Sequence, residues 1–433
     1  MKRWIIIIPL IILSSCHKKV GLSYLTTDVI KKYFDTIQII CDSDNGRLWG
    51  ENLYGPILFI DNRTRNIYSN VQDRKGILKG KDGIYTGVYP KERLIVASGI
   101  EFGGTRFAMV PLPNEENSYR ITSRSIHSLF HCYQARHNIG TDRYSVSHMN
   151  DESARLMLKL EWKALINAIK SSGSERDQAI HDALIFRGAR RELYPDGIRD
   201  ENEFECMEGL ATFTYMWLCT KSKDEFDVKL VDYLERIYRN PSYPLSYGFV
   251  HGALYAALLK DKNFDFRKIE SADFDLADAT AKIYNIKLPE TYHDVAGSLA
   301  MSYGLPSIKA EEQEIKKKIG DYTNKIVNDY TGRPNVKIIL ESPNFSFEAD
   351  DIFSLDTLGT FYRKLKVSDN WGRLTVDEGG ALIATDLKTL WVNASEVSAN
   401  HGRISGDGWH LRLNEGWHLV ETGESFSVIK VKN

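Results

Sequence analysis

Apolar and polar positions divide the chain into three regions with different periods. Between about residues 20 and 120, short apolar runs are separated by turn signals such as Asp44-Asn45-Gly46 and Gly103-Gly104. This pattern predicts a mixed α/β segment in which several strands follow one short helix. The expected helix covers residues 26–33, and the expected strands cover 56–61, 83–88, 93–98 and 106–111.

From about residue 123 to residue 331 the apolar positions follow a helical period. In the stretch 152–169, for example, Leu156, Leu160 and Ala164 fall on one stripe. The same spacing predicts further helices over residues 177–192, 202–221, 224–238, 246–260, 274–285, 290–303 and 308–328. The last of these is rich in Glu and Lys, which indicates a solvated outer helix.

After Pro334 the period becomes that of β-strands. The clearest unit is a predicted hairpin, with strands over 409–413 and 417–420 joined by a turn. Its alternation places Trp and Leu side chains on one face and His410 and His418 on the other. On that wet face we expect surface histidines and not a metal pair.

Length and composition fit a globular protein of two or three domains. The chain has 433 residues, of which 42% are hydrophobic and 26% charged, so disorder is excluded as its main state. We expect an α+β fold with a mixed segment over 16–122, a helical domain over 123–332 and an antiparallel β domain over 333–433. Lys and Arg number 56 against 58 Asp and Glu, which gives a net charge of -2. Without a basic excess we expect no nucleic-acid partner.

The first sixteen residues have the pattern of an export signal. Lys2 and Arg3 precede the apolar run 4–13, which is shorter than the ~20 residues needed to span a membrane. The ending 13–16, Leu-Ser-Ser-Cys, resembles the bacterial lipobox. That resemblance implies a signal peptide over 1–15 and a lipid, such as palmitate, on Cys16. It also implies a membrane anchor in the bacterial cell envelope, on the outer membrane facing the periplasm. A plain signal peptide is the alternative.

Export also permits disulfides, and four further cysteines are present: Cys41, Cys132, Cys206 and Cys219. Four are too few to build a fold of this size. One or two bridges are compatible with the sequence, and their pairing stays open.

Two histidines four residues apart form the first chemical motif. In His127-Ser128-Leu129-Phe130-His131, the two imidazoles face the same way if the segment is helical. We expect a helix here, capped by Ser123 or Ser125. This spacing lets one helix offer two nitrogens to zinc.

A second motif lies in the segment 205–211, Glu-Cys-Met-Glu-Gly-Leu-Ala. Together with the first motif it resembles the gluzincin-like zinc metallopeptidases, in which one helix bears HExxH and a second bears Glu-Gly-Leu-Ala. The likeness extends to uncharacterised secreted bacterial members of that group, through the segments 131–134 (His-Cys-Tyr-Gln) and 160–165 (Leu-Glu-Trp-Lys-Ala-Leu). It implies a zincin-like helix pair, with His127, His131 and Glu208 as ligands of zinc.

The chain departs from that family at the position of the general base. Ser128 stands where the family has Glu, and Thr212 stands where a further Glu is common. A serine hydroxyl cannot carry the proton from a zinc-bound water, and loss of a general base costs roughly 10²–10⁴-fold in rate. We therefore expect a pseudoenzyme with little or no proteolysis that binds a peptide or protein ligand.

Three alternatives stay open at this stage. The first is an active hydrolase with another base, such as Glu205, and with Tyr215 or Tyr247 as an oxyanion donor. The second is a purely structural envelope lipoprotein. In the third, the two histidines and Glu208 form a hydrogen-bonded cluster without metal.

Several neighbouring residues have simpler interpretations. We expect His251 to be a core histidine with its hydrogen bonds satisfied, and Glu161 to belong to a buried polar pair between helices. Cys132 and Cys206 flank the two motifs but point away from the ligand face by projection. They are therefore expected in packing or in a bridge, not as zinc thiolates.

Overall fold

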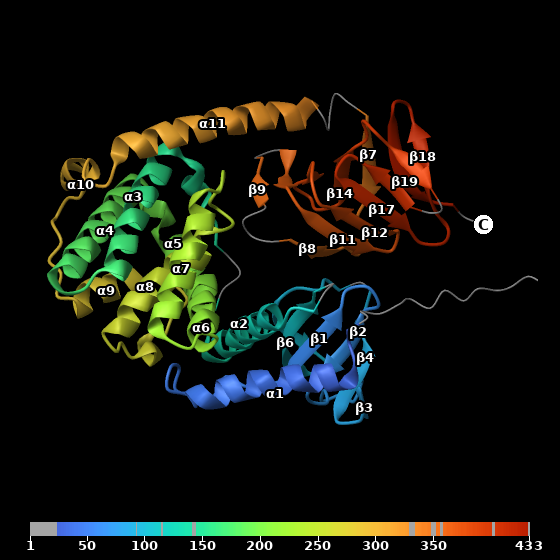
Figure 1. Ribbon diagram of the computed structural model, residues 1–433, viewed down its shortest axis with the longest axis horizontal. Helices are drawn as coiled ribbons and strands as arrows, with labels where there is room; N and C mark the ends of the chain where they lie inside the picture. The colour runs from blue at the N-terminus through green and yellow to red at the C-terminus, as the bar shows by residue number, and fades with distance from the viewer. Residues whose placement is uncertain are drawn as a thin grey trace, which may run out of the picture.

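The computed structural model describes residues 24–431 apart from 92, 114–115, 141–143, 329–333, 348–351, 356–357 and 401–402. Its fold is α+β, with a mixed N-terminal part, a helical part and a C-terminal β part (Figure 1). The expected signal peptide and the lipidation site Cys16 lie outside the described residues. Within the described residues, none of the helices combines the length and apolar character needed to cross a membrane.

The N-terminal part consists of one long helix and a six-stranded sheet. The helix α1 covers Thr27–Asp44, and the strand order is β3-β4-β2-β1-β6-β5. The strands are β1 Ile57–Asp61, β2 Asn66–Ser69, β3 Lys79–Lys81, β4 Ile84–Val88, β5 Ser98–Phe102 and β6 Thr105–Leu112. The pair β1–β6 is parallel, and the other pairs are antiparallel.

Two predictions for this part were wrong in detail. Helix α1 runs well past residue 33, because Ile37 and Cys41 continue its buried stripe until Asn45 ends it with φ 48°. The strand expected over 93–98 is absent from the described residues of that stretch, and β5 begins only at Ser98. The carbonyl of Arg93 instead accepts a hydrogen bond from the Arg65 guanidinium at 2.6 Å, which replaces a strand ladder there.

The helical part begins with α2, which covers Ser118–His137. It continues with α3 Glu152–Lys170, α4 Gly173–Leu193, α5 Ile198–Phe204, a π-helical turn Glu205–Gly209, α6 Leu210–Leu218, α7 Lys223–Tyr238, α8 Tyr247–Asp261, α9 Leu276–Ile283, α10 His293–Ala300 and α11 Leu305–Val327. The predicted cap of α2 was wrong. Asn117 caps it by accepting from the Arg120 amide at 2.9 Å, whereas the Ser125 hydroxyl donates to the Ile121 carbonyl inside the helix.

One cluster of buried apolar side chains joins the N-terminal and helical parts. It extends from Ile37 of α1 through Phe130 of α2 to Leu254 of α8. Trp49 lies at its centre, where the indole contacts the Phe130 ring and donates to the Thr214 hydroxyl at 3.0 Å. Helix α2 is therefore fixed between the sheet and the other helices.

Helix α11 crosses the top of the molecule in Figure 1 and leads from α10 to the β part. As expected it is mostly exposed, but Ile308 and Glu312 are buried against the bundle. Glu312 accepts two hydrogen bonds from Arg155 of α3, at 2.6 and 3.2 Å.

The C-terminal part has two sheets packed around their own core, with Trp371, Leu374 and Leu411 fully buried. The strand orders are β18-β19-β7-β14-β13-β10-β9 and β15-β16-β17-β12-β11-β8. The strands are β7 Asn335–Ile339, β8 Asn344–Ser346, β9 Ile352–Ser354, β10 Thr360–Tyr362, β11 Leu365–Asp369, β12 Gly372–Val376, β13 Ala381–Ile383, β14 Thr389–Asn393, β15 Ser398–Asn400, β16 Arg403–Gly406, β17 Trp409–Leu413, β18 Trp417–Thr422 and β19 Ser425–Lys430.

The predicted hairpin over 409–420 was wrong. Its two strands exist, but β17 pairs with β12 and β16, whereas β18 pairs with β19 in the other sheet. The chain changes sheets at the turn, where Gly416 has φ 80°. Both strands direct apolar residues toward the space between the sheets. The predicted alternation within each strand was therefore correct, whereas the predicted pairing of the two strands was wrong.

Candidate metal centre

Helix α2 brings His127 and His131 together on one face. Their Nε2 atoms lie 2.9 Å apart, and their rings are nearly perpendicular. The strands β5 and β6 cover the opposite side of the helix. The approach is close, because a Cβ added at Gly99 of β5 would lie 3.1 Å from the Cys132 sulfur. Strand and helix therefore fix the height and rotation of both imidazoles.

Glu208 comes from the π-helical turn between α5 and α6. Its Oε2 lies 3.3 Å from His127 Nε2 and 3.6 Å from His131 Nε2. The turn packs directly on α8, since a Cβ at Gly209 would lie 2.5 Å from the Gly252 Cα atom. Only glycine allows so close a contact. It fixes the position of the turn, and therefore of the neighbouring Glu208, against α8.

The three ligand atoms match the edges of a zinc coordination tetrahedron. With zinc–ligand bonds of about 2.0–2.1 Å, two ligand atoms of a tetrahedral site lie about 3.3 Å apart. The observed separations of 2.9, 3.3 and 3.6 Å bracket this value. Two imidazoles and one carboxylate are also the donor set of many catalytic zinc sites. The residues therefore fit a zinc ion with one further open position.

Gln134 determines which nitrogen of His131 carries the proton. Its amide nitrogen donates to the carbonyls of Cys206 and Met207, at 2.9 and 3.1 Å. The amide oxygen must therefore face His131 Nδ1, 2.7 Å away, and accept a hydrogen bond from its N–H group. A neutral His131 is then left with an Nε2 lone pair directed at His127 and Glu208. Such outer hydrogen bonds orient metal-binding histidines.

Burial and neighbouring charges act differently on the three groups. Burial lowers the pKa of His127, and the neighbouring His131 lowers it further. Burial alone would also lower the pKa of His131, but the Glu208 carboxylate outweighs this effect and raises it. Burial disfavours the charged form of Glu208, yet His131 and His127 lower its pKa well below the usual range. Glu208 is thus an anion at neutral pH.

The centre is narrow but not sealed. The side chain of His131 is 3% exposed, whereas those of His127 and Glu208 are 14% and 16% exposed. The exposed surface of the cluster therefore belongs to His127 and Glu208. His127 is flanked by the rings of Tyr215 and Phe249, with centroids 6.0 and 6.4 Å from the His127 ring.

Tyr215 thus lies beside the cluster, as its position on the ligand stripe predicted. Burial, followed by the charge of Tyr233, raises the pKa of Tyr215 well above its usual value. The phenol is therefore a neutral hydrogen-bond donor. Its role as an oxyanion donor stays a prediction.

Glu205 does not serve as the proposed base. It is fully buried, and both of its oxygens accept hydrogen bonds from Arg187, at 2.9 and 2.8 Å. The Tyr247 hydroxyl donates to it as well, at 3.1 Å. The alternative in which Glu205 acts as the base on a metal-bound water is therefore not supported, because its carboxylate is already paired with Arg187. Tyr247 is likewise engaged in this second cluster and not in an oxyanion site.

The second cluster also contains Glu161 and His251, as predicted for a buried polar pair and a satisfied core histidine. Glu161 accepts from Tyr255 at 2.6 Å and from Arg190. His251 Nδ1 accepts from the Trp162 indole at 2.9 Å, and its Nε2 lies 3.1 Å from Glu161. We call this assembly the Arg–Glu network. It is completed by Glu201 and Arg191, which lie 3.2 Å apart.

Ser128 and Thr212 stand at the two positions that depart from the family motif. Both are buried, and the Ser128 hydroxyl donates to the Met109 carbonyl of β6 at 3.1 Å. Among the groups that act most strongly on the pKa values of His127 and His131, Glu208 is the one carboxylate. The structure thus brings together the three expected ligands and places no described acid in the role of the missing base.

The four cysteines outside the signal are free thiols. Burial raises the pKa of the Cys132 thiol to about 11, so it is not a thiolate. Cys206 donates to the Phe274 carbonyl at 3.2 Å and points away from the cluster. The bridges that the sequence allowed are therefore not formed.

Sequence reasoning assigned no role to Gln134 or Arg187. Gln134 was detectable in principle, because it follows His131 by three residues on the same face of the helix. Arg187 carried no signal, because it is one of several charged residues in the helix Gly173–Leu193. In comparisons with known proteins, no family model, no curated protein and no solved structure matches this chain.

Proposed function

We propose that this chain is a metallopeptidase-like protein that holds zinc through His127, His131 and Glu208 and binds a peptide or protein ligand with little or no proteolysis. The observation that carries the proposal is the convergence of three ligand atoms at 2.9, 3.3 and 3.6 Å. The Gln134 hydrogen bond supports it, because it leaves the His131 lone pair facing the other two ligands.

A bound zinc ion would supply a positive charge with an open coordination position that polarises a carbonyl oxygen. The chain itself supplies the ligands and the neutral phenol of Tyr215 beside them. None of the carboxylates in the described part of the chain is seen in position to move a proton from water to a leaving amine. Ser128 is bonded to the Met109 carbonyl, and Glu205 is bonded to Arg187. Ligand binding without efficient hydrolysis follows from this donor set.

The lipobox-like ending at Cys16 supports an anchored location, on the outer membrane facing the periplasm. The test is Cys16→Ala, which should abolish labelling with radioactive palmitate and release the protein from the membrane fraction. Labelling that persists in this variant would contradict the proposed anchor.

Elemental analysis tests the metal. Protein purified without chelator should contain about one zinc per chain, and His131→Ala or Glu208→Gln should lower that content, since three ligands are needed for tight binding. His410→Ala and His418→Ala are matched controls and should retain full zinc. Zinc-free wild-type protein would favour the hydrogen-bonded cluster without metal.

Cleavage of mixed peptide libraries tests the chemistry. The wild-type protein should show no cleavage that is sensitive to chelator, and strong activity would overturn the pseudoenzyme proposal. Ser128→Glu restores the carboxylate but displaces the hydroxyl bonded to Met109. A gain of about a hundredfold, or ~2.7 kcal/mol, would identify Ser128 as the main lesion. If the single change fails, Ser128→Glu with Thr212→Glu is the next test.

A further inference from the structure

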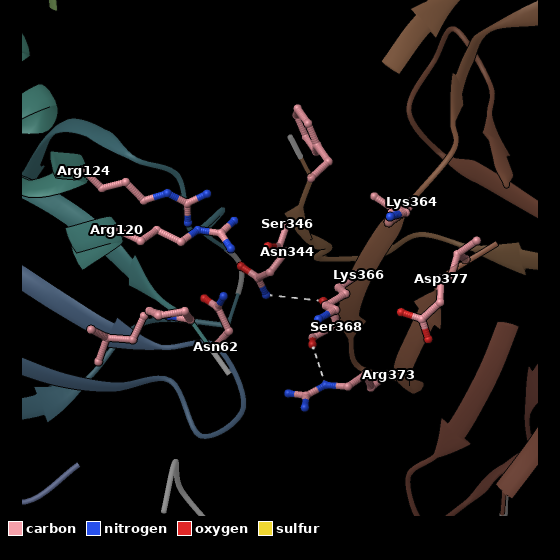
Figure 2. Close-up of a pocket in the computed structure, with 15 residues that line it drawn as sticks. Asn62, Arg120, Arg124, Asn344, Ser346, Lys364, Lys366, Ser368, Arg373 and Asp377 are labelled. Carbon is pink, nitrogen blue, oxygen red and sulfur yellow. Dashed lines mark hydrogen bonds between the residues drawn. The ribbon is translucent and has the colours of Figure 1, made fainter. Parts of the chain in front are cut away.

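A basic cleft separates the N-terminal sheet and α2 from the C-terminal β part. It consists of two adjoining cavities of about 240 Å³ and about 620 Å³, which share Asn62, Lys366 and Arg373 among their lining residues. Figure 2 shows Arg120 and Arg124 extending from one wall and Lys366 and Arg373 from the other. The whole chain has a charge of only -2, so positive charge is concentrated here.

The C-terminal wall carries a row of arginines in register. Arg403 of β16 is paired with Arg412 of β17, and Arg412 is paired with Arg373 of β12. All three line the larger cavity. Like charges directly opposite one another on neighbouring strands destabilise a sheet. A bound anion would neutralise the row and offset this repulsion.

The N-terminal wall adds Arg63, Lys91, Arg120 and Arg124. Burial, and then the charge of Arg120, lower the pKa of Arg124 to about 10. Burial is the main cause that lowers the pKa of Arg373. The charge of Arg63, on the opposite wall, lowers it further, so like charges also act across the cleft.

Two carboxylates line the cleft, those of Asp369 and Asp377. Asp369 already accepts from the backbone amides of Glu341 and Ser342, at 2.8 and 2.9 Å. The cleft therefore keeps an excess of positive charge.

We propose that this basic cleft binds an acidic peptide segment whose chain continues along α2 toward His127. The choice of a peptide rests on the proposed function, because the zinc cluster is what makes a peptide the expected ligand. By helical projection Arg120, Arg124, His127 and His131 fall within about 60° of one another. Arg124, which lines the smaller cavity, and His127 are about 4.5 Å apart along the helix axis, so an extended chain that leaves the cleft at Arg124 has less than one helical turn to cross to His127.

The lining of the cleft favours a peptide over other polyanions. Among the described residues that line the two cavities, Phe347 of the smaller one is the single Phe, Tyr or Trp, so the cleft offers no row of rings on which successive bases could stack. A flat bilayer surface could not enter a cleft between two walls. Amides and hydroxyls such as Asn62, Ser342 and Thr375 lie among the cations and suit the peptide groups of a bound chain.

Fluorescence anisotropy on the full protein tests this proposal. The probes are a short fluorescein-labelled Asp/Glu peptide and the same peptide with Asn and Gln in place of the acids. The competitors are a single-stranded oligonucleotide and vesicles containing phosphatidylglycerol. The acidic peptide should bind, the neutral one should not, and binding should weaken with salt.

A charge-reversed pair of variants locates the binding. Lys366→Glu with Arg412→Glu changes two exposed side chains of the cleft and should weaken the acidic peptide roughly tenfold or more. The control pair Lys388→Glu with Lys430→Glu makes the same change in charge on exposed residues that do not line the two cavities, and should leave binding within about twofold.

The outcomes separate the two proposals. If the acidic peptide shows no preference, or if both variant pairs weaken it equally, the cleft proposal is overturned whatever the zinc content. Tighter binding of the oligonucleotide or the vesicles overturns the choice of a peptide. If zinc is absent but the cleft variants alone lose the peptide, the cleft proposal stands and the metal proposal fails.

Discussion

Glu205 and Glu208 stand three residues apart in one π-helical turn and serve opposite purposes. Glu205 is fully buried and receives two hydrogen bonds from Arg187, inside a network in which acids and guanidinium groups balance. Glu208 faces two imidazoles on α2 at a partly open edge. The Glu205 carboxylate, which is neutralised by guanidinium groups, stabilises the fold. The Glu208 carboxylate, which faces two imidazoles, is able to bind a cation.

The π-helical turn produces this division. In a regular α-helix, residues i and i+3 lie about 60° apart around the axis, so Glu205 and Glu208 would share a face. The wider i→i+5 turn separates them further. The packing of Gly209 on Gly252 fixes the turn against α8. Substitutions that disturb one carboxylate and leave the other intact can therefore show whether Glu205 and Glu208 have separate roles.

The largest effect is expected from breaking the Arg–Glu network. Arg187→Met leaves the buried Glu205 without its main partner, which should cost about 3–5 kcal/mol of unfolding free energy. Urea denaturation followed by circular dichroism measures it. Lys282→Met removes an exposed partner of the exposed Asp278 and should leave the midpoint unchanged. An equal shift in both variants would contradict the distinction between buried and exposed pairs.

Removal of the Gln134 amide should lower zinc affinity, and it also leaves the carbonyls of Cys206 and Met207 without this donor. Gln134→Leu deletes the acceptor of the His131 Nδ1 proton and should lower zinc affinity about 10–100-fold. Competition with a chromophoric chelator measures the affinity. Arg187→Met, tested under conditions where it stays folded, should keep wild-type affinity. Unchanged zinc binding in Gln134→Leu would show that the orienting bond is dispensable.

A methyl group at the helix crossing should disturb both clusters together. In Gly209→Ala the new Cβ would lie 2.5 Å from Gly252 Cα, and such overpacking costs about 1–3 kcal/mol. Stability and zinc content should fall together, because both glutamates belong to this turn. Gly297→Ala has no atom within 4 Å of its new Cβ and should be neutral or slightly stabilising.

The smallest effect concerns Asp275 at the rim of the network, 2.5 Å from Arg191. Burial disfavours its charge, but Arg191 lowers the pKa of Asp275 to about 2. A lowered folded-state pKa gives stability that is present above the unfolded value of 3.8 and is lost as pH falls toward 2.

Asp275→Asn keeps an acceptor for the α9 cap and removes only the charge. It should cost about 1–2 kcal/mol at pH 7, and the difference from wild type should vanish between about pH 4 and pH 2. Denaturation at a series of pH values measures both. A difference that stays constant with pH would assign the effect to capping and not to charge.

The sequence predicted the fold class, most helices and the three residues that converge at the candidate centre. The fold class, the helices and the juxtaposition of His127 with His131 follow from local periodicity and spacing, whereas Glu208 was predicted only through the resemblance to the gluzincin-like motif. The hairpin over 409–420 shows the limit of such reasoning. Its alternation was right, but the partners of β17 and β18 lie in different sheets, and strand pairing over long separations leaves no local signal.

The sequence by itself determined which residue types stand at each motif: two histidines, one glutamate and a serine in place of the base. Tertiary structure alone decided that Glu208 meets the histidines and that Glu205 does not. The physical reason is that one π-helical turn and one glycine contact set the direction of both side chains, and neither is visible in the spacing of residues. The arginine row of the cleft was decided in the same way, because strand register brings together Arg373, Arg403 and Arg412 from separate strands.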